Sequence, residues 1–264
     1  TLDFVCAKSG EPYFIDSFGE YWRAYHFVED AYALEEVKDP QDFYESAVAF
    51  GNFQRMLADF PADTLTETIA GFHDTKARFA AFEKAVEEDV CGRAAGVQQE
   101  IRFIKDRYDV ACVLGDLLEA GELPLRVTHN DTKSNNVLMD NTTGKGLCVI
   151  DLDTVMPGLA VNDFGDSIRF GASTGAEDEK DLSKISCDME LYDIYAKGFV
   201  EGCGGALTDM EIECLPIGAK VMTYECGMRF LTDYLSGDTY FKVDYPTHNL
   251  DRTRTQLKLV WDME

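Results

Sequence analysis

Hydrophobic and polar residues follow two different patterns along this chain. Residues 12–28 hold closely spaced aromatic and β-branched residues around a Ser17-Phe18-Gly19 turn, which predicts a β-hairpin. From Asp39 onward, apolar residues recur every three or four positions, which is typical of helices. Asp39 is placed to cap the first helix and Pro40 to occupy its first position. Further helical patterns cover about 75–88, 96–119, 181 onward and 251–262.

The stretch from residue 125 to residue 151 differs from the helical regions around it. Three short apolar strands are predicted there, LRVTH, VLMD and LCVID, separated by the polar run NDTKSNN and the turn NTTGKG. Further on, Thr208 and Glu211 form a capping-box pattern, and Pro216 is expected to break or kink the helix that follows. The order of hairpin, helices, β-insert and helices predicts an α+β fold.

Composition and charge narrow the class of protein. The chain has 264 residues, of which 45% are hydrophobic, enough for one or two domains with a core and too many for a disordered chain. A net charge of −25 argues against nucleic-acid or membrane-surface partners, but a nucleotide whose charge is met by metal ions remains compatible. None of the eight cysteines forms a C-x-x-C pair, which favours reduced thiols in a cytoplasmic protein.

The polar loop after the first strand of the insert holds the most informative chemistry. Asp131 lies in this loop, Asn136 begins the next strand, and Asp151 ends the strand after the NTTGKG turn. Pairing of those two strands would bring Asn136 and Asp151 together as oxygen ligands for Mg²⁺, beside the carboxylate of Asp131. Phosphoryl transfer requires a metal on the phosphates and a carboxylate that accepts the hydroxyl proton.

These motifs resemble those of known kinases. The pattern H-x-D-x-x-x-x-N followed by a strand ending in I-D resembles the catalytic and metal loops of kinases. In the form THNDTKSNNVL and VIDLDTVMPG it is similar to the aminoglycoside phosphotransferase and choline kinase superfamily. The stretches IDLDTVMPGLAVNDFGDSIRFGAS and ECGMRFLTDYLSGDTYF most resemble N-acetylhexosamine 1-kinases. The resemblance implies a protein-kinase-like fold of the aminoglycoside phosphotransferase type.

The resemblance also implies roles for individual residues. Asp131 matches the catalytic carboxylate, and Asn136 and Asp151 match ligands of Mg²⁺. His129 matches the motif histidine, which braces the loop, and Asp166 matches an acidic residue that hydrogen-bonds the loop from behind.

The implied substrates are ATP and a sugar. Arg229 and Tyr240 match sugar-contacting positions, and the segment from Glu29 to Ala31 matches the hinge that meets adenine. An N-acetylhexosamine phosphorylated at its anomeric hydroxyl is the preferred acceptor. An aminoglycoside, choline or an amino-alcohol is the alternative acceptor, and a non-catalytic sugar-binding lobe is the alternative class.

Three further stretches match motifs of kinases or phosphatases, but we do not assign those functions to them. Asp163-Phe164-Gly165 has the sequence of the metal-binding tripeptide of protein kinases. No predicted strand places it beside Asn136, so we expect it to form a helix-capping turn. The string from Asp151 to Val155 also matches the nucleophile motif of haloacid-dehalogenase-type phosphatases, which the flanking helices disfavour. Lys8 directly precedes the hairpin, without room for the helix and glutamate that a kinase phosphate-binding lysine requires.

Ordinary structural interpretations stand beside the functional ones. Arg229 could pair with Asp233 one helical turn away, and Tyr240 could be a core residue. Asp153 could stabilise a turn. The acidic run 177–181 is most simply a solvated helix start.

The N-terminal part departs from the family pattern. Residues 1–31 are expected to be a remnant of a kinase N-terminal lobe, and residues 32–264 the helical C-terminal lobe with its catalytic β-insert at about 125–155. No Gly-rich loop precedes residue 12. On this interpretation the chain binds nucleotide weakly and does not turn over ATP. Its hairpin is expected to be mobile or covered through self-association.

Overall fold

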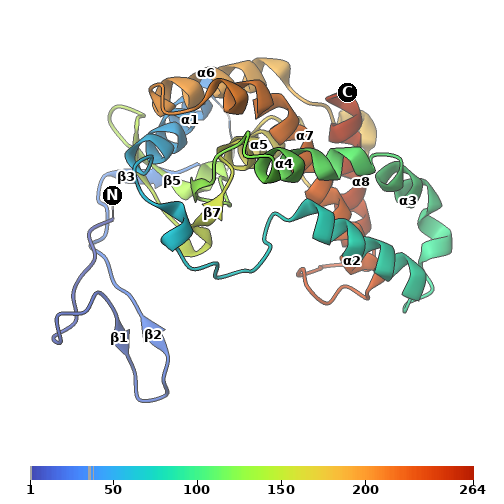
Figure 1. Cartoon of the computed structure of the whole chain (residues 1–264), viewed down its shortest axis with the longest axis horizontal. Coiled ribbons are helices and arrows are strands. Elements are labelled where there is room, and N and C mark those ends of the chain that lie inside the picture. The colour runs from blue at the N-terminus through green and yellow to red at the C-terminus, as the bar shows by residue number, and fades with distance from the viewer. Residues whose placement is uncertain (1, 35–36, 38) are drawn as a thin grey trace.

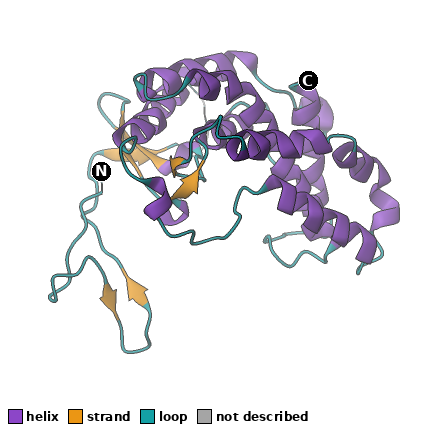
Figure 2. Cartoon of the chain, in the orientation of Figure 1, coloured by secondary structure: helices purple, strands orange, loops and turns teal. Residues whose placement is uncertain are grey.

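An N-terminal hairpin projects from a body made mostly of helices (Figures 1 and 2). The structure, a computed structural model, describes residues 2–34, 37 and 39–264. Its helices are α1 (Pro40–Met56), α2 (Thr75–Glu88), α3 (Gln98–Lys105), α4 (Tyr108–Glu119), α5 (Ala160–Gly171), α6 (Met189–Cys203), α7 (Asp209–Leu235) and α8 (His248–Asp262). Its strands are β1 (Phe14–Ile15), β2 (Tyr21–Trp22), β3 (Ala31–Ala33), β4 (Arg126–Thr128), β5 (Val137–Asp140), β6 (Gly146–Val149) and β7 (Met156–Gly158). Within the described residues, no helix combines the length and apolar character needed to cross a membrane.

The predicted hairpin is confirmed. Strands β1 and β2 pair antiparallel, with Phe14 opposite Trp22. The turn is held by the Asp16 carboxylate, which accepts from the backbone N–H of Phe18 at 2.8 Å and from the indole N–H of Trp22 at 2.9 Å. Several aromatic side chains of this segment face solvent, with Phe18 89% and Phe27 84% exposed. The hairpin therefore buries little of its own apolar surface.

The first two helices begin where the sequence predicts. The Asp39 side chain accepts from the N–H of Gln41 at 2.9 Å, and Pro40 occupies the first position of α1. The Asp74 side chain caps α2 by accepting from the N–H of Ala77. The predicted capping box at Thr208 and Glu211 is present at the start of α7.

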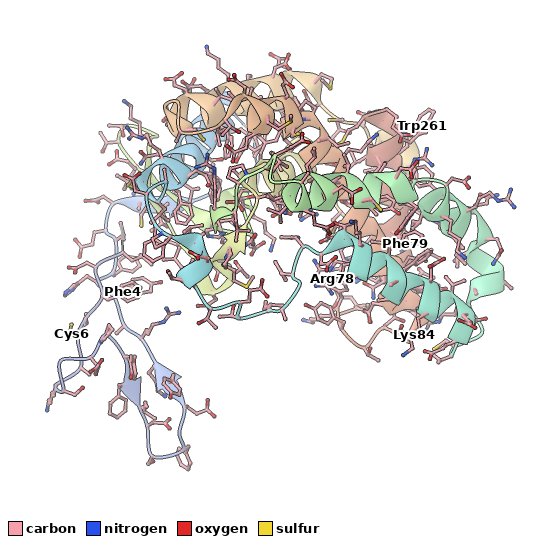
Figure 3. All side chains as sticks on the ribbon, viewed as in Figure 1. Phe4, Cys6, Arg78, Phe79, Lys84 and Trp261 are labelled. Atoms are coloured by element: carbon pink, nitrogen blue, oxygen red, sulfur yellow. The ribbon has the colours of Figure 1, made fainter. Side chains whose placement is uncertain are left out.

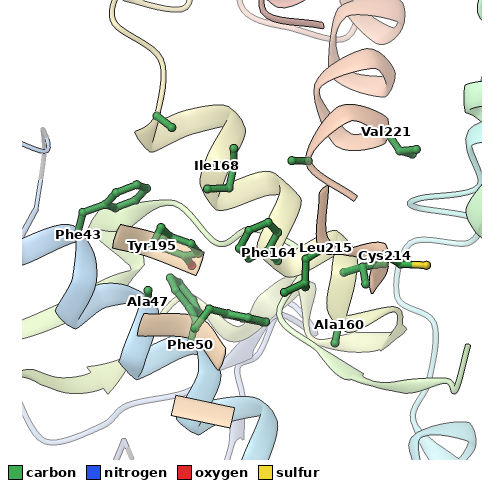
Figure 4. Close-up of a cluster of buried hydrophobic side chains, with 14 of the residues drawn as sticks. Phe43, Ala47, Phe50, Ala160, Phe164, Ile168, Tyr195, Cys214, Leu215 and Val221 are labelled. Carbon is green, nitrogen blue, oxygen red and sulfur yellow. The ribbon is translucent and has the colours of Figure 1, made fainter. Parts of the chain in front are cut away.

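Two hydrophobic clusters hold the helical body together. The larger one joins α1, α5, α6 and α7 (Figure 4) and includes the fully buried rings of Phe43, Phe50, Phe164, Tyr195 and Phe199. The second joins α2, α3, α4, α7 and α8 around Phe82, Ile104, Tyr224 and Leu231. Helix α7 contributes to both clusters, so it connects the two halves of the body.

Helices α5 and α7 cross at two glycines. A Cβ atom on Gly165 would collide with the backbone of Gly218, and one on Gly218 would collide with the backbone of Val161. This contact therefore requires residues without side chains. It matters because α5 carries carboxylates that reach the loop after β4.

The predicted helix over 96–119 is two helices. Helix α3 ends at Lys105 and α4 begins at Tyr108. At the break, the Arg107 guanidinium lies 3.5 Å from the centre of the Phe103 ring and pairs with Glu264 at 2.7 Å. These are tertiary contacts, so the spacing of apolar residues along the chain could not predict the break.

Three other helices also differ from the prediction. Residues 182–184 form only a short 3₁₀ turn, and α6 begins at Met189 rather than near 181. Helix α7 continues through Pro216 without a break. Helix α8 begins at His248, three residues before the predicted start.

Two small sheets hold the loop predicted to carry the chemistry. Strand β3 pairs with β5 and β5 with β6, all antiparallel, and β4 pairs with β7. The strands β4, β5 and β6 confirm the predicted insert, whereas β7 and α5 were not anticipated. Residues 129–136 therefore leave one sheet and enter the other, with α5 packed behind them.

Candidate active site

The loop between β4 and β5, residues 129–136, is braced from within by a buried histidine. His129 donates from Nε2 to the carbonyl oxygen of Ile150 at 2.8 Å, and its Nδ1 accepts from the N–H of Asp131 at 3.3 Å. Its ring packs edge-on against Phe50 and Phe53. With both ring nitrogens occupied, His129 positions the loop, which confirms the bracing role that the sequence indicated.

Two carboxylates of α5 hold the same loop from behind. Asp163 accepts from the N–H of His129 at 2.9 Å and from the N–H of Asn130 at 2.8 Å. Asp166 accepts from the N–H of Thr132 at 3.0 Å, as the resemblance implied. These buried N–H groups have no strand partner, so the carboxylates satisfy donors that would otherwise be costly to bury.

Asp163 corrects one sequence interpretation. The expectation that Asp163-Phe164-Gly165 forms a helix-capping turn is wrong, because all three residues lie inside α5 and are buried. Burial raises the pKa of the Asp163 carboxyl, although the N–H groups that donate to it act to lower that pKa. The side-chain amide of Gln54 adds a third donor at 2.7 Å. Asp163 therefore supports the loop, and its oxygens face away from solvent.

Asp131 presents its carboxylate at the outer side of the loop, with its side chain one-quarter exposed. Lys133 approaches it at 2.8 Å, and the amide of Asn136 donates to its carbonyl oxygen at 2.8 Å and to its carboxylate at 3.3 Å. Burial opposes the charged form of Lys133, but the hydrogen bond and charge of Asp131 raise its pKa. Lys133 was missed by the sequence reasoning, although its position two residues after Asp131 was a visible signal.

Strands β5 and β6 place Asn136 beside the end of the next strand. Val137 lies opposite Val149, and the N–H of Ile150 donates to the carbonyl oxygen of Asn136 at 2.9 Å. Asp151 follows directly, exposed, with a left-handed backbone at φ 59° and ψ 59°. Such a conformation costs about 1–3 kcal/mol for a residue other than glycine, so the surrounding structure imposes it. The predicted proximity of these two chain positions is confirmed.

The predicted hinge segment lies along β5. Ala31 pairs with Asp140, and the N–H of Asn141 donates to the carbonyl oxygen of Asp30 at 2.9 Å. Glu29 is exposed just before this strand. Contact of Glu29 and Ala31 with adenine stays a prediction.

Arg229 and Tyr240 meet at a separate pocket of about 230 Å³ beside α2 and α7. The Arg229 guanidinium lies 5.5 Å from the centre of the Phe72 ring, 5.9 Å from that of Tyr240 and 5.6 Å from that of Phe241. Tyr240 is 67% exposed, so the interpretation of it as a core residue is wrong.

Asp233 is not the ion-pair partner of Arg229. Its carboxylate accepts from the N–H groups of Thr239, Tyr240 and Phe241 at 2.8–3.0 Å, and from the amide of Asn249 at 2.9 Å. Asp233 therefore shapes the loop that carries Tyr240.

A buried arginine connects α5 to the acidic run. Arg169 pairs with Asp166 at 3.0 Å and with Glu177 at 2.9 Å. The interpretation of 177–181 as a solvated helix start is therefore wrong, since the run is a loop whose first residue forms an ion pair with Arg169. Burial alone would raise the pKa of Asp166, but Arg169 and other nearby positive charges hold it below its usual value.

A second buried cluster lies on α7 between this network and the aromatic pocket. Glu225 accepts from Thr75 at 2.6 Å and contacts His73 at 2.9 Å. Burial raises the pKa of the neighbouring Cys226 to about 12, against the opposing charges of both Arg169 and Arg229. The charges of both arginines therefore act on the Cys226 thiol.

Asp153 has a structural partner at the surface. It forms an ion pair with Arg23 at 2.6 Å, with both side chains more than half exposed. This contact ties the projecting N-terminal segment to the turn after Asp151.

The fold and the loop define a kinase-like protein. Residues 7–194 match the sequence profile of the phosphotransferase enzyme family (APH), which is more than half of the chain. The chain belongs to this family of enzymes, and the predicted α+β, protein-kinase-like fold is confirmed.

Solved structures share the fold at low sequence identity. An aminoglycoside phosphotransferase from Alicyclobacillus acidocaldarius is 14% identical over 96% of this chain and 71% of its own, with a TM-score of 0.63. A spectinomycin phosphotransferase, solved with ADP and spectinomycin, is 12% identical over 99% and 75%, with a TM-score of 0.57. A Plasmodium vivax ethanolamine kinase is 16% identical over 89% and 64%, with a TM-score of 0.55. This chain therefore spans about two thirds to three quarters of their lengths.

The buried Arg169 network gives a pH-dependent prediction. Arg169→Met should lower the free energy of unfolding at pH 7.5 by about 3–5 kcal/mol, because it leaves the buried Asp166 carboxylate without its ion-pair partner, whereas Glu177 keeps Arg252. In the wild type, Asp166 has a lowered pKa and stays ionised between pH 7.5 and 5. In the variant, loss of the Arg169 charge and hydrogen bond lets burial shift that pKa upward against the remaining charges of His73 and Lys133, so protonation relieves part of the penalty and the deficit shrinks as pH falls.

Urea unfolding across this window, above the isoelectric point of about 4.4, measures the deficit. Arg254→Met is the matched control, because the Arg254–Glu100 pair is partly exposed and should contribute at most about 1 kcal/mol. A deficit for Arg169→Met that does not change with pH would contradict the assignment.

Proposed function

We propose that the residues around Asp131 are the active site of an enzyme that transfers the γ-phosphoryl group of ATP to a hydroxyl of a small molecule, with an N-acetylhexosamine as the preferred acceptor and its anomeric hydroxyl as the preferred site. The expectation that residues 1–264 by themselves do not turn over ATP stays a prediction, which an ADP-release assay tests. The observation that supports the proposal most is the arrangement of Asp131 with Lys133 and Asn136 on a loop fixed by α5. A carboxylate so placed can orient an acceptor hydroxyl and take its proton.

The residues beside Asp131 fit a magnesium ion. Asn136 directs its amide N–H at Asp131, which leaves its side-chain oxygen free to act as a metal ligand. Asp151 is exposed and forms no ion pair among the described residues. One amide and one carboxylate oxygen suit Mg²⁺, which takes few protein ligands and completes its shell with water and substrate phosphates. Bound there, Mg²⁺ would neutralise charge on the β- and γ-phosphates.

Positive charge for the transferred group is available on the same loop. Lys133 lies next to Asp131, and its partly buried ammonium remains charged because of that neighbour. A phosphoryl group between Lys133 and the acceptor hydroxyl would be fixed by a charge that needs no rearrangement. Glu29 and Ala31 would meet the adenine at the β3 side.

The acceptor is proposed from the pocket that Arg229 and Tyr240 line. The aromatic rings and the free guanidinium edge there suit a ring-shaped, polar molecule. Spectinomycin is a ligand of one structural neighbour, and ethanolamine is named in another, so an aminoglycoside or an amino-alcohol is the alternative acceptor.

An acceptor panel tests the proposal directly. ADP release is measured with N-acetylhexosamines, aminoglycosides, choline and ethanolamine, beside acceptor binding by calorimetry. Turnover with an N-acetylhexosamine supports the proposal. Turnover only with a cationic acceptor would assign the alternative, and sugar binding without turnover would make the protein a binding lobe.

Asp131→Asn should reduce turnover by about a hundred- to ten-thousand-fold, because the amide cannot accept the hydroxyl proton. Acceptor affinity should change little, since Arg229 and Tyr240 stay in place. Steady-state kinetics and calorimetry separate the two effects. Retention of more than a tenth of the wild-type rate would rule out the assignment.

Asp151→Ala should raise the Mg²⁺ concentration needed for half-maximal activity and nearly abolish turnover. Asp163→Asn should instead lower the stability and the rate while leaving the Mg²⁺ requirement unchanged, because Asp163 faces the loop backbone. Asp153→Ala, two residues from Asp151, is the matched surface control. Magnesium titrations of all three variants test the placement, and a changed requirement in Asp163→Asn alone would show that the metal site is misplaced.

A further inference from the structure

Two arginines with no acidic partner line the pocket of about 230 Å³ that Tyr240 borders. Neither Arg78 of α2 nor Arg229 of α7 forms an ion pair among the described residues. The chain as a whole carries 49 acidic residues against 24 basic ones, so most arginines have acidic groups to pair with. Among the described arginines without an ion pair, Arg78 and Arg229 are two that line one pocket, so together they are candidates to bind an anionic ligand.

The positive charges of Arg78 and Arg229 also repel each other. Burial and the nearby positive charge of Arg229 together lower the pKa of Arg78, against the opposing charges of Glu225, Tyr240 and Asp74. Arg78 uses one nitrogen to donate to the carbonyl oxygen of Phe72 at 3.1 Å. Its Nε is buried and has no partner in the described part of the chain. A buried donor without a partner is costly, so the position of Arg78 beside the pocket is not explained by its own contacts.

Arg229 is fixed in orientation but keeps its donors free. Three aromatic rings, those of Phe72, Tyr240 and Phe241, surround its guanidinium at 5.5–5.9 Å. Arg229 makes no hydrogen bond among the described residues. Rings hold the guanidinium by its charge and its faces, which leaves N–H groups available for an acceptor in the plane.

The carboxylates near the pocket are already engaged. Asp233 lines it, but four N–H donors, from the backbone of 239–241 and from Asn249, occupy both of its oxygens. Glu225 is held by His73 and Thr75. Asp74 caps α2. None of the three forms an ion pair with Arg78 or Arg229 among the described residues, although the charges of Glu225 and Asp74 act on Arg78.

We propose that the pocket lined by Arg78 and Arg229 is an oxyanion-binding subsite, which takes the carboxylate or phosphate group of an acidic sugar. Paired guanidinium groups bind such groups through several charge-assisted hydrogen bonds. The subsite shares Arg229 with the proposed acceptor site. Anion binding there does not depend on the proposed kinase function, but a role of the subsite in turnover rests on it. It narrows the acceptor to hexosamine-type sugars that carry an oxyanion.

Binding to the purified protein tests the subsite without any turnover. Calorimetric titrations at constant ionic strength use inorganic phosphate, glucuronate, N-acetylglucosamine 6-phosphate and neutral N-acetylglucosamine. The phosphorylated sugar should bind about ten- to a hundredfold more tightly than the neutral one. Comparing inorganic phosphate with glucuronate shows whether the subsite prefers a phosphate or a carboxylate group. Preferential binding of either one supports the subsite.

Variants localise the binding. Arg78→Gln should weaken the phosphorylated sugar about ten- to a hundredfold, and Lys84→Gln, which removes an exposed charge from the same helix (Figure 3), should not. Ala81→Glu places a carboxylate at the pocket and should compete with the ligand while leaving both arginines present. Thermal unfolding confirms that each variant is folded.

Three results would overturn the proposal. The first is equal affinity for the phosphorylated and the neutral sugar. The second is an affinity that Arg78→Gln and Ala81→Glu leave unchanged in folded protein. The third is phosphate binding that responds to Lys133→Gln instead, which would place the anion at the catalytic loop. Failure of the ADP-release assay with every acceptor, N-acetylglucosamine 6-phosphate included, would reject the proposed function and leave these binding results valid.

Discussion

Hydrogen bonds from the loop after β4 to two carboxylates on α5 are the constraint on which the site depends. The loop leaves one small sheet and enters another, so its N–H groups at His129, Asn130 and Thr132 have no neighbouring strand. Asp163 and Asp166 accept all three. Because they lie three residues apart on one helix, both point to the same side, and the loop takes its shape from the helix.

The rest of the body serves to place that helix. Helix α5 packs in the larger hydrophobic cluster through Phe164 and Ile168, and it meets α7 at a glycine contact that fixes their distance. Arg169 neutralises Asp166 from within the core. Asp131 thereby keeps its carboxylate one-quarter exposed, while Asp163, Asp166 and Arg169, which support the loop, are buried.

Three positive side chains lie at or behind the candidate site in this acidic chain. Lys133 lies at the loop, Arg169 behind it, and Arg229 at the aromatic pocket. Each occupies a place where negative charge would otherwise accumulate or arrive with a substrate. A net charge of −25 is thus compatible with binding anionic ligands at particular points.

Local signals allowed much of the fold to be predicted. Asp39 and Pro40 mark the start of α1, and alternating apolar residues around a glycine turn mark the hairpin and the insert. Helix α5 was missed because Leu159 offers no capping side chain and a Pro-Gly pair precedes it, so no start signal is present.

Spacing along the chain predicted the residues of the candidate site that are close in sequence, whereas distant residues were named only from the resemblance or were missed. Asp131, Asn136 and Asp151 belong to one hairpin and its flanking loop, so spacing alone brings them together. Arg78 meets Arg229 only because α2 packs against α7, and neither helix carries a motif that reports the contact. The break at Arg107 has the same origin, in the partner Glu264 at the far end of the chain.

Native-state hydrogen exchange of the loop amides tests the central claim most directly. If the α5 carboxylates fix the loop, the Thr132 amide exchanges slowly in the wild type. In Asp166→Asn it should exchange about ten- to a hundredfold faster, because an ionised acceptor is lost. Amides of β5 and β6 should change little. Equal exchange of Thr132 in both proteins, or rapid exchange already in the wild type, would contradict the account.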